Sequence, residues 1–294
     1  MLFKEAINLF CEKKAIRAER ASVSYGDNIR LFQKHINKEL SEVEEDDIVK
    51  WQTYLKKNKQ ENTQRIHAIS LRQFFKFCEG RGWTTIKWED IEVTRVREKV
   101  PEYVVQPDFE KLCDIAKASD IKLLAIRLLF MTGIRVSELC DIATKDLDLK
   151  EMCCYVHTRK AFRPKIISWD TATNDILLKV LAAGKYEYLF ASPHGGKLTT
   201  RQIQRWVKEL KEKAGIEKHV TPHSFRHGFT KENMNINTPL PDLMTMLGHK
   251  SLAGLERYTK RMDTDIREKA RESLRKRLGT TKFKELEKLL KEVS

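Results

Sequence analysis

Apolar residues recur at helical spacing along most of the 294-residue chain, and one basic stretch over residues 91–106 lacks this pattern. That stretch, IEVTRVREKVPEYVVQ, has Pro101 near its middle and is predicted to be a linker. An internal loop of one larger domain is the alternative interpretation. A chain of this length can bury two separate cores, so the pattern favours two mainly helical domains.

Residues 1–90 are predicted to form a helical bundle with one small core. Its four expected helices follow the apolar stripes Leu2, Phe3, Ile7 and Phe10; Tyr25, Ile29, Phe32 and Ile36 after Ser22–Ser24; Ile48, Trp51, Tyr54 and Leu55; and Ile66, Ile69, Phe74 and Phe77. Asp46–Asp47 is the expected N-terminal cap of the third helix, and Gly80 begins the stop signal of the fourth.

Helical patterning resumes at Pro107-Asp108 and continues to Gly133, which is expected to end a helix. Two short β-rich runs, CCYVHT and KIISWD, flank RKAFRP and predict a small hairpin. Further helices are expected over 176–181, 201–214, 224–234 and 241–247, and in a tail after residue 263. The predicted fold is therefore mainly α, with an N-terminal helical bundle and a mostly helical α+β domain that carries a small antiparallel sheet.

Charge and cysteine content give weaker indications. Lysine and arginine number 56 against 42 acidic residues, and this surplus favours a polyanionic partner such as nucleic acid, although Lys-rich soluble proteins share it. The six cysteines form no CxxC pair and are expected to be reduced. Because no signal peptide or membrane-length apolar run is present, we expect a cytoplasmic location.

Four segments of the second region carry side chains suited to phosphoryl transfer: TGIRVSEL (132–139), HTRKAFRPK (157–165), TPHSFRHGF (221–229) and LGHKSLAGLERY (247–258). A phosphodiester carries negative charge that shifts further in the transition state and must be neutralised. The sequence has no EF-hand loop, P-loop or acidic metal cluster, so side chains must supply the positive charge. Arg135 and Arg226 are the candidates, because a guanidinium fork can hold two phosphate oxygens, and His223 could share that phosphate.

The candidate nucleophile is Tyr258. Ionising a phenol at pH 7 costs roughly 4 kcal/mol, and nearby cations together with His223 and His249 would lower that cost. The leaving 5′-oxygen needs a proton, for which Lys160 at the tip of the predicted hairpin is the candidate general acid.

Each of these residues also has a simpler interpretation. Arg135 followed by Glu138 is usually a surface helix pair, and a hairpin lysine or a lone tyrosine usually has no catalytic role. His219, His223 and His227 are spaced like metal ligands on one helix face. Pro222 argues against a continuous helix through all three, so no metal site is predicted.

Taken jointly and in this order, the four segments resemble the signature of the tyrosine recombinase (phage integrase) family. Residues 107–260 resemble its catalytic domain strongly, and residues 1–90 resemble its helical core-binding domain. TGIRVSEL is similar to the family's first arginine box, which implies a catalytic role for Arg135 and a supporting role for Glu138. HSFRH is similar to the second box and places His223 and Arg226 in the active site.

The last segment keeps the family's spacing of nine residues between His249 and Tyr258. By this resemblance His249 helps to bind the scissile phosphate and Tyr258 attacks it, while Lys160 falls where the family places its hairpin lysine, with Arg163 and Lys165 nearby. Two departures are visible: NMNINTPLPD stands where a glycine is common, and Ala253-Gly254 replace the usual hydroxyl residues. They touch packing and loop shape rather than a catalytic group.

The resemblance implies cleavage and rejoining of DNA through a 3′-phosphotyrosyl link, without metal, ATP or other cofactor. It also implies double-stranded DNA with a specific recombination site as the partner, and a homotetramer on synapsed DNA that passes through a Holliday junction. The implied domains are 1–90 for core binding, 91–106 as a basic linker crossing one side of the DNA, and 107–262 for catalysis.

Residues 263–294 form the expected tail, whose apolar stripe consists of Phe283, Leu286, Leu289, Leu290 and Val293. This helix either docks on a neighbouring subunit or folds back on its own domain. Two other functions compete with recombination: DNA relaxation by a type IB topoisomerase, and DNA binding by a non-catalytic regulator. An RNA-binding scaffold explains the charge but not the four segments. The base-reading residues, the DNA target, and the choice between mobile-element integration and Xer-like dimer resolution are not predictable from the sequence.

Overall fold

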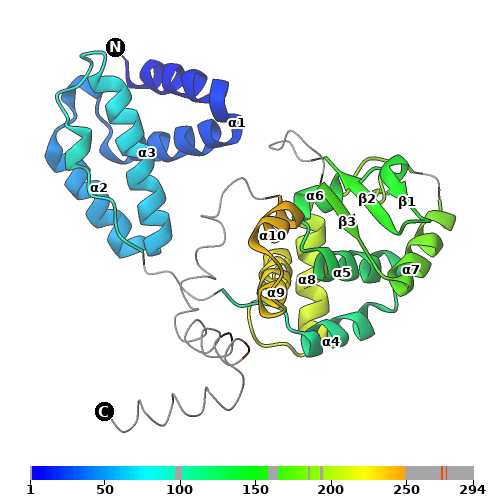
Figure 1. Ribbon diagram of the computed structural model, residues 1–294. Coiled ribbons are helices and arrows are strands. Elements are labelled where there is room, and N and C mark those ends of the chain that lie inside the picture. The colour runs from blue at the N-terminus through cyan, green and yellow to red at the C-terminus, as the bar shows by residue number, and fades with distance from the viewer. Residues whose placement is uncertain are drawn as a thin grey trace, which may run out of the picture. The chain divides into compact units, whose positions relative to one another are not determined.

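Two separate hydrophobic cores divide the computed structural model into the units Met1–Lys99 and Val100–Ser294, each of which is described by itself (Figure 1). The structure describes residues 2–96, 101–157, 165–184, 186–192 and 195–248, together with residues 273 and 276; for residues 17–20 it describes only the backbone. The division falls inside the stretch 91–106. Ile91 is buried in the first core and Val104 in the second, so both ends of that stretch pack into a core. The domain boundaries themselves stay a prediction.

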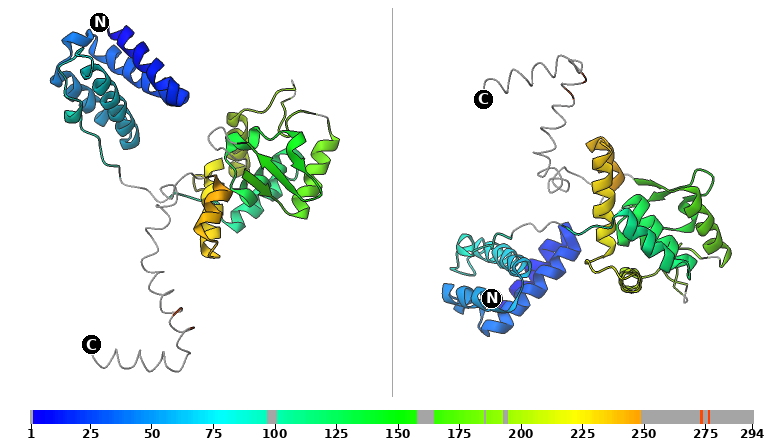
Figure 2. Two further views of the ribbon diagram at one scale, coloured as in Figure 1. Left: turned by 45° about the horizontal axis from the view of Figure 1, so that its top comes forward. Right: turned by 90° about the horizontal axis from the view of Figure 1, so that it is seen from below.

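The first unit is helical throughout its described secondary structure (Figures 1 and 2). Its elements are α1 (Phe3–Ile36), the short 3₁₀ helix η1 (Leu40–Glu42), α2 (Glu45–Asn58), α3 (Glu61–Glu79) and η2 (Trp88–Asp90). Aromatic rings fill the core, where Phe74 of α3 contacts both Phe3 and Phe10 of α1 at centroid distances of 5.6 Å. Because these rings come from the predicted stripes, the expected bundle core is confirmed.

The two helices expected near the N-terminus are one continuous helical element, α1, so their separation was wrong. The chain nevertheless reverses direction within it (Figure 1). The reversal brings Ser22 close to Cys11, and Ser22 Oγ donates a 2.6 Å hydrogen bond to the Cys11 carbonyl. Eleven residues of straight helix would separate these groups by about 16 Å. A Cβ on Gly26 would lie only 2.7 Å from Sγ of Cys11, so the two halves approach closely at this glycine. The residues between the two halves are mostly helix formers and include no proline, which explains why the chain stays helical through the reversal.

The third predicted helix also begins earlier than expected. α2 starts at Glu45, and its cap is Glu44 rather than the pair Asp46–Asp47. Asp47 instead accepts a 3.0 Å hydrogen bond from the backbone N–H of Glu44 and pairs with Lys38 at 2.8 Å. The acidic residues therefore satisfy the helix start from inside its first turn.

The second unit contains the helices α4 (Gln106–Ala116), α5 (Asp120–Thr132), α6 (Val136–Cys140), α7 (Thr171–Ala182), α8 (Thr200–Lys213), α9 (Pro222–Asn235) and α10 (Leu240–Leu247), with the 3₁₀ helix η3 (Thr144–Asp146). α5 is apolar on most of its surface and packs against α4, α7 and α9 (Figure 1). A helix that is hydrophobic nearly all round belongs in the middle of a core. Its C-terminal end leads from this core into the TGIRVSEL segment, which carries Arg135.

A small antiparallel sheet packs beside these helices with strand order β1 (Leu147–Asp148), β2 (Cys153–Val156) and β3 (Lys165–Ser168). The predicted pairing of the two β-rich runs is confirmed, with Val156 opposite Lys165. The two-residue strand β1 was missed, because so short a run has no periodicity of its own. Cys154 is buried while Cys153 is partly exposed, as the alternation of a strand requires, and all six cysteines are free.

The 101–105 segment leads into the second unit along α9. The backbone N–H of Val104 donates to the carbonyl of Ser224 at 3.2 Å, and Lys218 Nζ donates to the carbonyl of Tyr103 at 2.7 Å. A Cβ on Gly228 would lie 2.3 Å from the carbonyl oxygen of Val104. Glycine at this helical position therefore permits a backbone contact that any side chain would block.

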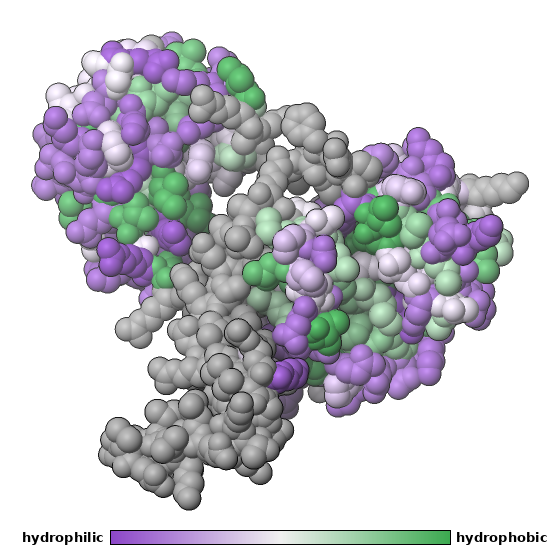
Figure 3. Space-filling view, in the orientation of Figure 1, coloured by the Kyte–Doolittle hydropathy of each residue, from purple (hydrophilic) through white to green (hydrophobic). Residues whose placement is uncertain are grey.

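The visible surface is mostly hydrophilic, with hydrophobic side chains in small separate patches (Figure 3). Among the described residues, no helix is both long and apolar enough to cross a membrane.

Candidate active site

The first box folds as a tight turn between α5 and α6. Gly133 follows the last residue of α5 with a φ of 56°, and a Cβ there would lie 2.6 Å from the ring of Phe229. Thr132 Oγ1 accepts a 3.2 Å hydrogen bond from the backbone N–H of Ile134 and donates to the carbonyl of Leu128 at 2.6 Å. The predicted helix end at Gly133 is confirmed, and the turn places Arg135 at the start of α6.

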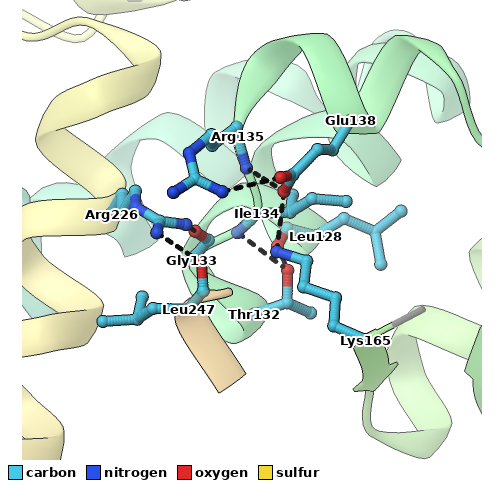
Figure 4. Close-up of polar contacts among 9 residues, drawn as sticks. All are labelled: Leu128, Thr132, Gly133, Ile134, Arg135, Glu138, Lys165, Arg226 and Leu247. Carbon is cyan, nitrogen blue, oxygen red and sulfur yellow. Dashed lines mark hydrogen bonds and ion pairs between the residues drawn. The ribbon is translucent and has the colours of Figure 1, made fainter. Parts of the chain in front are cut away.

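Glu138 holds Arg135 at two points (Figure 4). Its Oε2 accepts a 3.1 Å hydrogen bond from the Arg135 backbone N–H, and its Oε1 accepts a 2.8 Å hydrogen bond from Nη1 of the same arginine. The carboxylate side chain is 8% exposed and the arginine side chain 38% exposed, so a buried group orients an accessible one. The pair is therefore more constrained than an ordinary surface helix pair.

Arg226 brings the second box to the same place. It lies on α9 with 4% exposure, and its Nη1 donates to the carbonyl of Gly133 at 2.7 Å. Its Nη2 donates to the carbonyl of Leu247 at 2.6 Å, at the end of α10. One guanidinium thus joins the turn of the first box to the helix that leads into the LGH segment (Figure 4). His223 is exposed one turn before Arg226 on α9, and its ring lies 4.3 Å from that of His227.

Lys165, the first residue of β3, completes the cluster although the sequence marks it only as a neighbour of Lys160. Its Nζ lies 2.7 Å from Glu138 Oε2, and its side chain is 4% exposed. The alternation of the strand could have predicted its burial, because Lys165 and Ile167 lie on the same inward face of β3. A lysine at an inward position of a strand is unusual unless it is paired.

The charges of this cluster shift the pKa values of its members. Burial alone would raise the pKa of Glu138, but the attraction of Lys165 and the hydrogen bonds from Arg135 hold it below its ordinary value. Burial lowers the pKa of Lys165, Glu138 opposes that shift, and Arg226 and Arg135 add to it. With three cations and a single carboxylate, these four groups have a positive surplus, which suits an anionic ligand such as a phosphate.

Gly248 lies next to this cluster and precedes His249. Its φ is 63°, and a Cβ there would lie 3.6 Å from Arg135 Nη1 and 3.7 Å from Lys165 Cδ. The segment that carries the predicted phosphate ligand His249 therefore starts beside the two cations.

Four of the predicted site residues are described: Arg135 and Glu138 are in contact, while His223 and Arg226 lie together on α9. Lys160, His249 and Tyr258 lie outside the described residues. α9 begins at Pro222, so His219 precedes the helix that carries the other two histidines. Among the described residues, no group of three or more His, Cys, Asp and Glu side chains is arranged to hold a metal ion.

The chain is similar to known proteins over most of its length. Residues 103–264 match the model of the phage integrase family. The chain is 26% identical over 250 residues to the tyrosine recombinase XerC of Anoxybacillus flavithermus, which covers 80% of this chain and 83% of that protein. It is 24% identical over 251 residues to a tyrosine recombinase of Thermosipho africanus, covering 82% and 88% of the two chains.

Two solved structures share the fold. The crystal structure of XerA recombinase matches with a TM-score of 0.52 at 25% identity, covering 90% of this chain and 96% of that one. A lambda integrase dimer bound to a COC′ core site matches with a TM-score of 0.73 at 17% identity, covering 88% and 77%. Since the family model spans more than half of the chain and includes both arginine boxes, the chain belongs to the phage integrase family of tyrosine recombinases.

Proposed function

We propose that this chain is a site-specific DNA recombinase that cuts and rejoins DNA strands through a covalent link to Tyr258. The observation that carries the proposal is the convergence of Arg135 and Arg226, 91 positions apart in the sequence, at the turn around Gly133. Two arginines, a buried carboxylate that orients one of them, and a positive surplus are what metal-free phosphoryl transfer requires.

In the proposed reaction, the Tyr258 phenolate attacks the scissile phosphorus and the bond to the 5′-oxygen breaks. Lys160 gives its proton to that oxygen, which leaves as a 5′-hydroxyl, and a 3′-phosphotyrosyl bond remains. The 5′-hydroxyl of a partner strand then gives its proton to Lys160 and attacks the phosphorus, and the bond to Tyr258 breaks to release the phenolate. Because the bond energy is retained in the phosphotyrosine, the cycle needs no ATP, and side-chain cations are proposed to neutralise the phosphate charge in place of a metal.

The other site residues bind and orient the phosphate. Arg135, Arg226 and His223 are proposed to contact its oxygens together with His249, and Glu138 keeps Arg135 in position. Removing a donor to a developing negative charge costs roughly 10²–10³ in rate in other enzymes, so either arginine should be essential.

The proposed partner is double-stranded DNA with a specific recombination site, bound by a homotetramer. A lambda integrase tetramer bound to a Holliday junction is among the solved structures of this fold, at 17% identity and a TM-score of 0.71. We propose the same assembly for this chain, acting in the cytoplasm either on a mobile element or in Xer-like dimer resolution.

Covalent capture tests the proposal on DNA of any sequence, so the recombination site need not be chosen beforehand. Wild-type protein and the Tyr258→Phe variant would meet pooled genomic DNA fragments in chelator, followed by denaturation and sequencing of protein-linked DNA. Tyr155→Phe is the matched control, because Tyr155 is an exposed tyrosine on β2. We expect sequence-focused adducts with the wild type and with Tyr155→Phe, and none with Tyr258→Phe.

The other outcomes identify the competing functions. Adducts scattered over many sequences would indicate a type IB topoisomerase instead. No adduct despite tight DNA binding would indicate a non-catalytic DNA-binding regulator and would overturn the proposal.

A further inference from the structure

Lys165 is a charged residue in a position that usually holds an apolar one. It occupies the inward face of β3 beside Ile167, and only 4% of its side chain is exposed. Taking an ammonium group out of water costs several kcal/mol unless a partner compensates. Its ion partner is Glu138, at 2.7 Å.

Glu138 connects this buried ammonium to Arg135. Oε2 faces Lys165 Nζ and also accepts the hydrogen bond from the Arg135 backbone, while Oε1 accepts from the guanidinium (Figure 4). The carboxylate is fixed by contacts on both sides. Without the ammonium, one oxygen would lose its charged partner inside the protein, and the carboxylate would rotate or take up a proton. Either change would weaken the hydrogen bonds that orient Arg135.

We propose that Lys165 is a positioning residue for DNA cleavage, which holds Glu138 in the orientation that directs the Arg135 guanidinium toward the scissile phosphate. This inference rests on the proposed function and adds a residue to it. Lys165 acts through Glu138 and does not transfer a proton itself, because its Nζ is directed at the carboxylate.

A role in stability alone would not require a lysine here. Replacing a buried ion pair by well-packed apolar residues is often neutral or stabilising in other proteins. The ion pair instead has a geometric consequence. Lys165 contacts Glu138 and Glu138 contacts Arg135, and Arg135 is the most accessible of the three. The position of β3 in the sheet thereby determines the position of a catalytic cation carried by α6.

The test compares Lys165→Met, Lys165→Arg, Glu138→Gln and the double variant Lys165→Met/Glu138→Gln with the wild type. Lys150→Met, which changes an exposed lysine of the same unit, is the control. Each full-length protein would be mixed in excess with the pooled genomic fragments that the wild type captures, and the single-turnover rate of adduct formation would be measured over a series of pH values, with DNA retention measured separately.

We expect Lys165→Met to slow adduct formation, with a displaced guanidinium costing on the order of a hundredfold, while DNA retention stays near the wild-type level. Lys165→Arg should restore most of the rate, and the double variant should be no slower than Lys165→Met, because the two residues act as one unit. In Lys165→Met the unpaired Glu138 should also give the rate a new dependence on acid pH, rising as the carboxylate ionises. A residue needed only for folding would produce neither that dependence nor the non-additivity.

An unchanged rate in Lys165→Met, or losses that multiply in the double variant, would overturn the inference. If the methionine variant fails to fold, Lys165→Gln, which also removes the ammonium group, provides the same comparison. If the wild type forms no adduct, the proposed function fails and positioning is read from side-chain NMR of Arg135. Its guanidinium signals should then be ordered in the wild type and Lys165→Arg but averaged in Lys165→Met and Glu138→Gln, and Lys165→Met signals that match the wild type would reject the inference.

Discussion

Glu209 is a carboxylate whose ionisation links α8 to the central helix of the catalytic unit. Its Oε2 accepts a 2.8 Å hydrogen bond from Lys122 of α5, and its Oε1 accepts one of 2.9 Å from Lys213. These two bonds lower the pKa of Glu209 from 4.5 to about 2. A carboxylate whose pKa is lowered in the folded state contributes stability that is fully present above pH 4.5 and is lost as the pH falls toward 2.

The Glu209→Gln variant should therefore melt at a lower temperature than the wild type at pH 7, and the difference should shrink between pH 4.5 and about 2. Thermal unfolding over this pH range measures it. Glu212→Gln is the matched control on α8, because Glu212 lies 3.8 Å from Lys208 with both side chains largely exposed. A Glu209→Gln melting curve that stays below the wild type by the same amount at every pH would contradict the prediction.

At the scale of residues, the sequence predicts side chains that the proposed chemistry requires. It does not predict side chains whose role depends on which residues they contact in the fold. Arg135 and Arg226 are predictable because phosphoryl transfer needs guanidinium groups in segments such as these. Lys165 is not, because a lysine in a basic hairpin looks solvated until β3 turns it inward against Glu138. The carbonyl contacts of Arg226 are equally invisible, since they join positions 93 and 21 residues away.

At the scale of elements, the connection between α9 and α10 turns without a glycine. α9 ends at Asn235, and Asn237 has a φ of 59°, in the left-handed region. Asparagine tolerates this conformation better than other residues with a side chain. We expect Asn237→Ala to destabilise the chain by roughly 1 kcal/mol and Asn237→Gly to leave it unchanged or slightly more stable. Denaturant titration compares them, and equal midpoints for the two variants would contradict the expectation.

The contact between α9 and the 101–105 segment gives a second prediction at this scale. Gly228→Ala would place a methyl group against the Val104 carbonyl, and overpacking of this kind costs about 1–3 kcal/mol. The variant should lower the unfolding midpoint and speed hydrogen exchange at the amide of Val104, which bonds to Ser224. Gly196→Ala is the control, because the nearest atom to a Cβ there is 4.0 Å away. Unchanged exchange at Val104 would show that the segment does not depend on this glycine.

Element types were easier to predict than element boundaries. α8 lies within one residue of its predicted range 201–214, and α5 ends at the predicted Gly133 stop. The break between α4 and α5 after Ala116 was not predicted, because the helical pattern continues across it. α1 was divided in two because its chain reverses without leaving the helical conformation, which no stop residue announces. The α6 helix, only five residues long, was recognised as a motif rather than as a helix.

At the scale of the whole molecule, the separation into two cores follows from where periodicity is lost. The buried residues up to Ile91 form one cluster and those from Val104 onward form another, so the loss of pattern over residues 91–106 marks the boundary between the two cores. The fold class was predictable for the same reason. The placement of Lys160, His249 and Tyr258 stays a prediction, because all three fall outside the described residues.

The tail carries the last prediction, which concerns assembly. The sequence pattern predicts a charged helix with Phe283, Leu286 and Leu289 on one apolar stripe, and such a stripe would need a surface to cover it. We predict that this surface belongs to a neighbouring subunit, so that deleting residues 280–294 abolishes DNA-dependent assembly but leaves the monomer folded. Sedimentation of the protein with its captured DNA measures assembly, and thermal unfolding measures the monomer.

Point variants separate this docking from a simple loss of chain. Leu286→Ser with Leu289→Ser should reproduce the deletion, because it removes the apolar stripe, while Lys284→Gln with Lys288→Gln should assemble like the wild type. If the tail instead folds back on its own domain, the deletion and the leucine variant would lower the melting temperature of the monomer before any DNA is added. A truncated protein that still assembles and recombines normally would refute any role of the stripe in assembly, because the truncation removes the whole stripe.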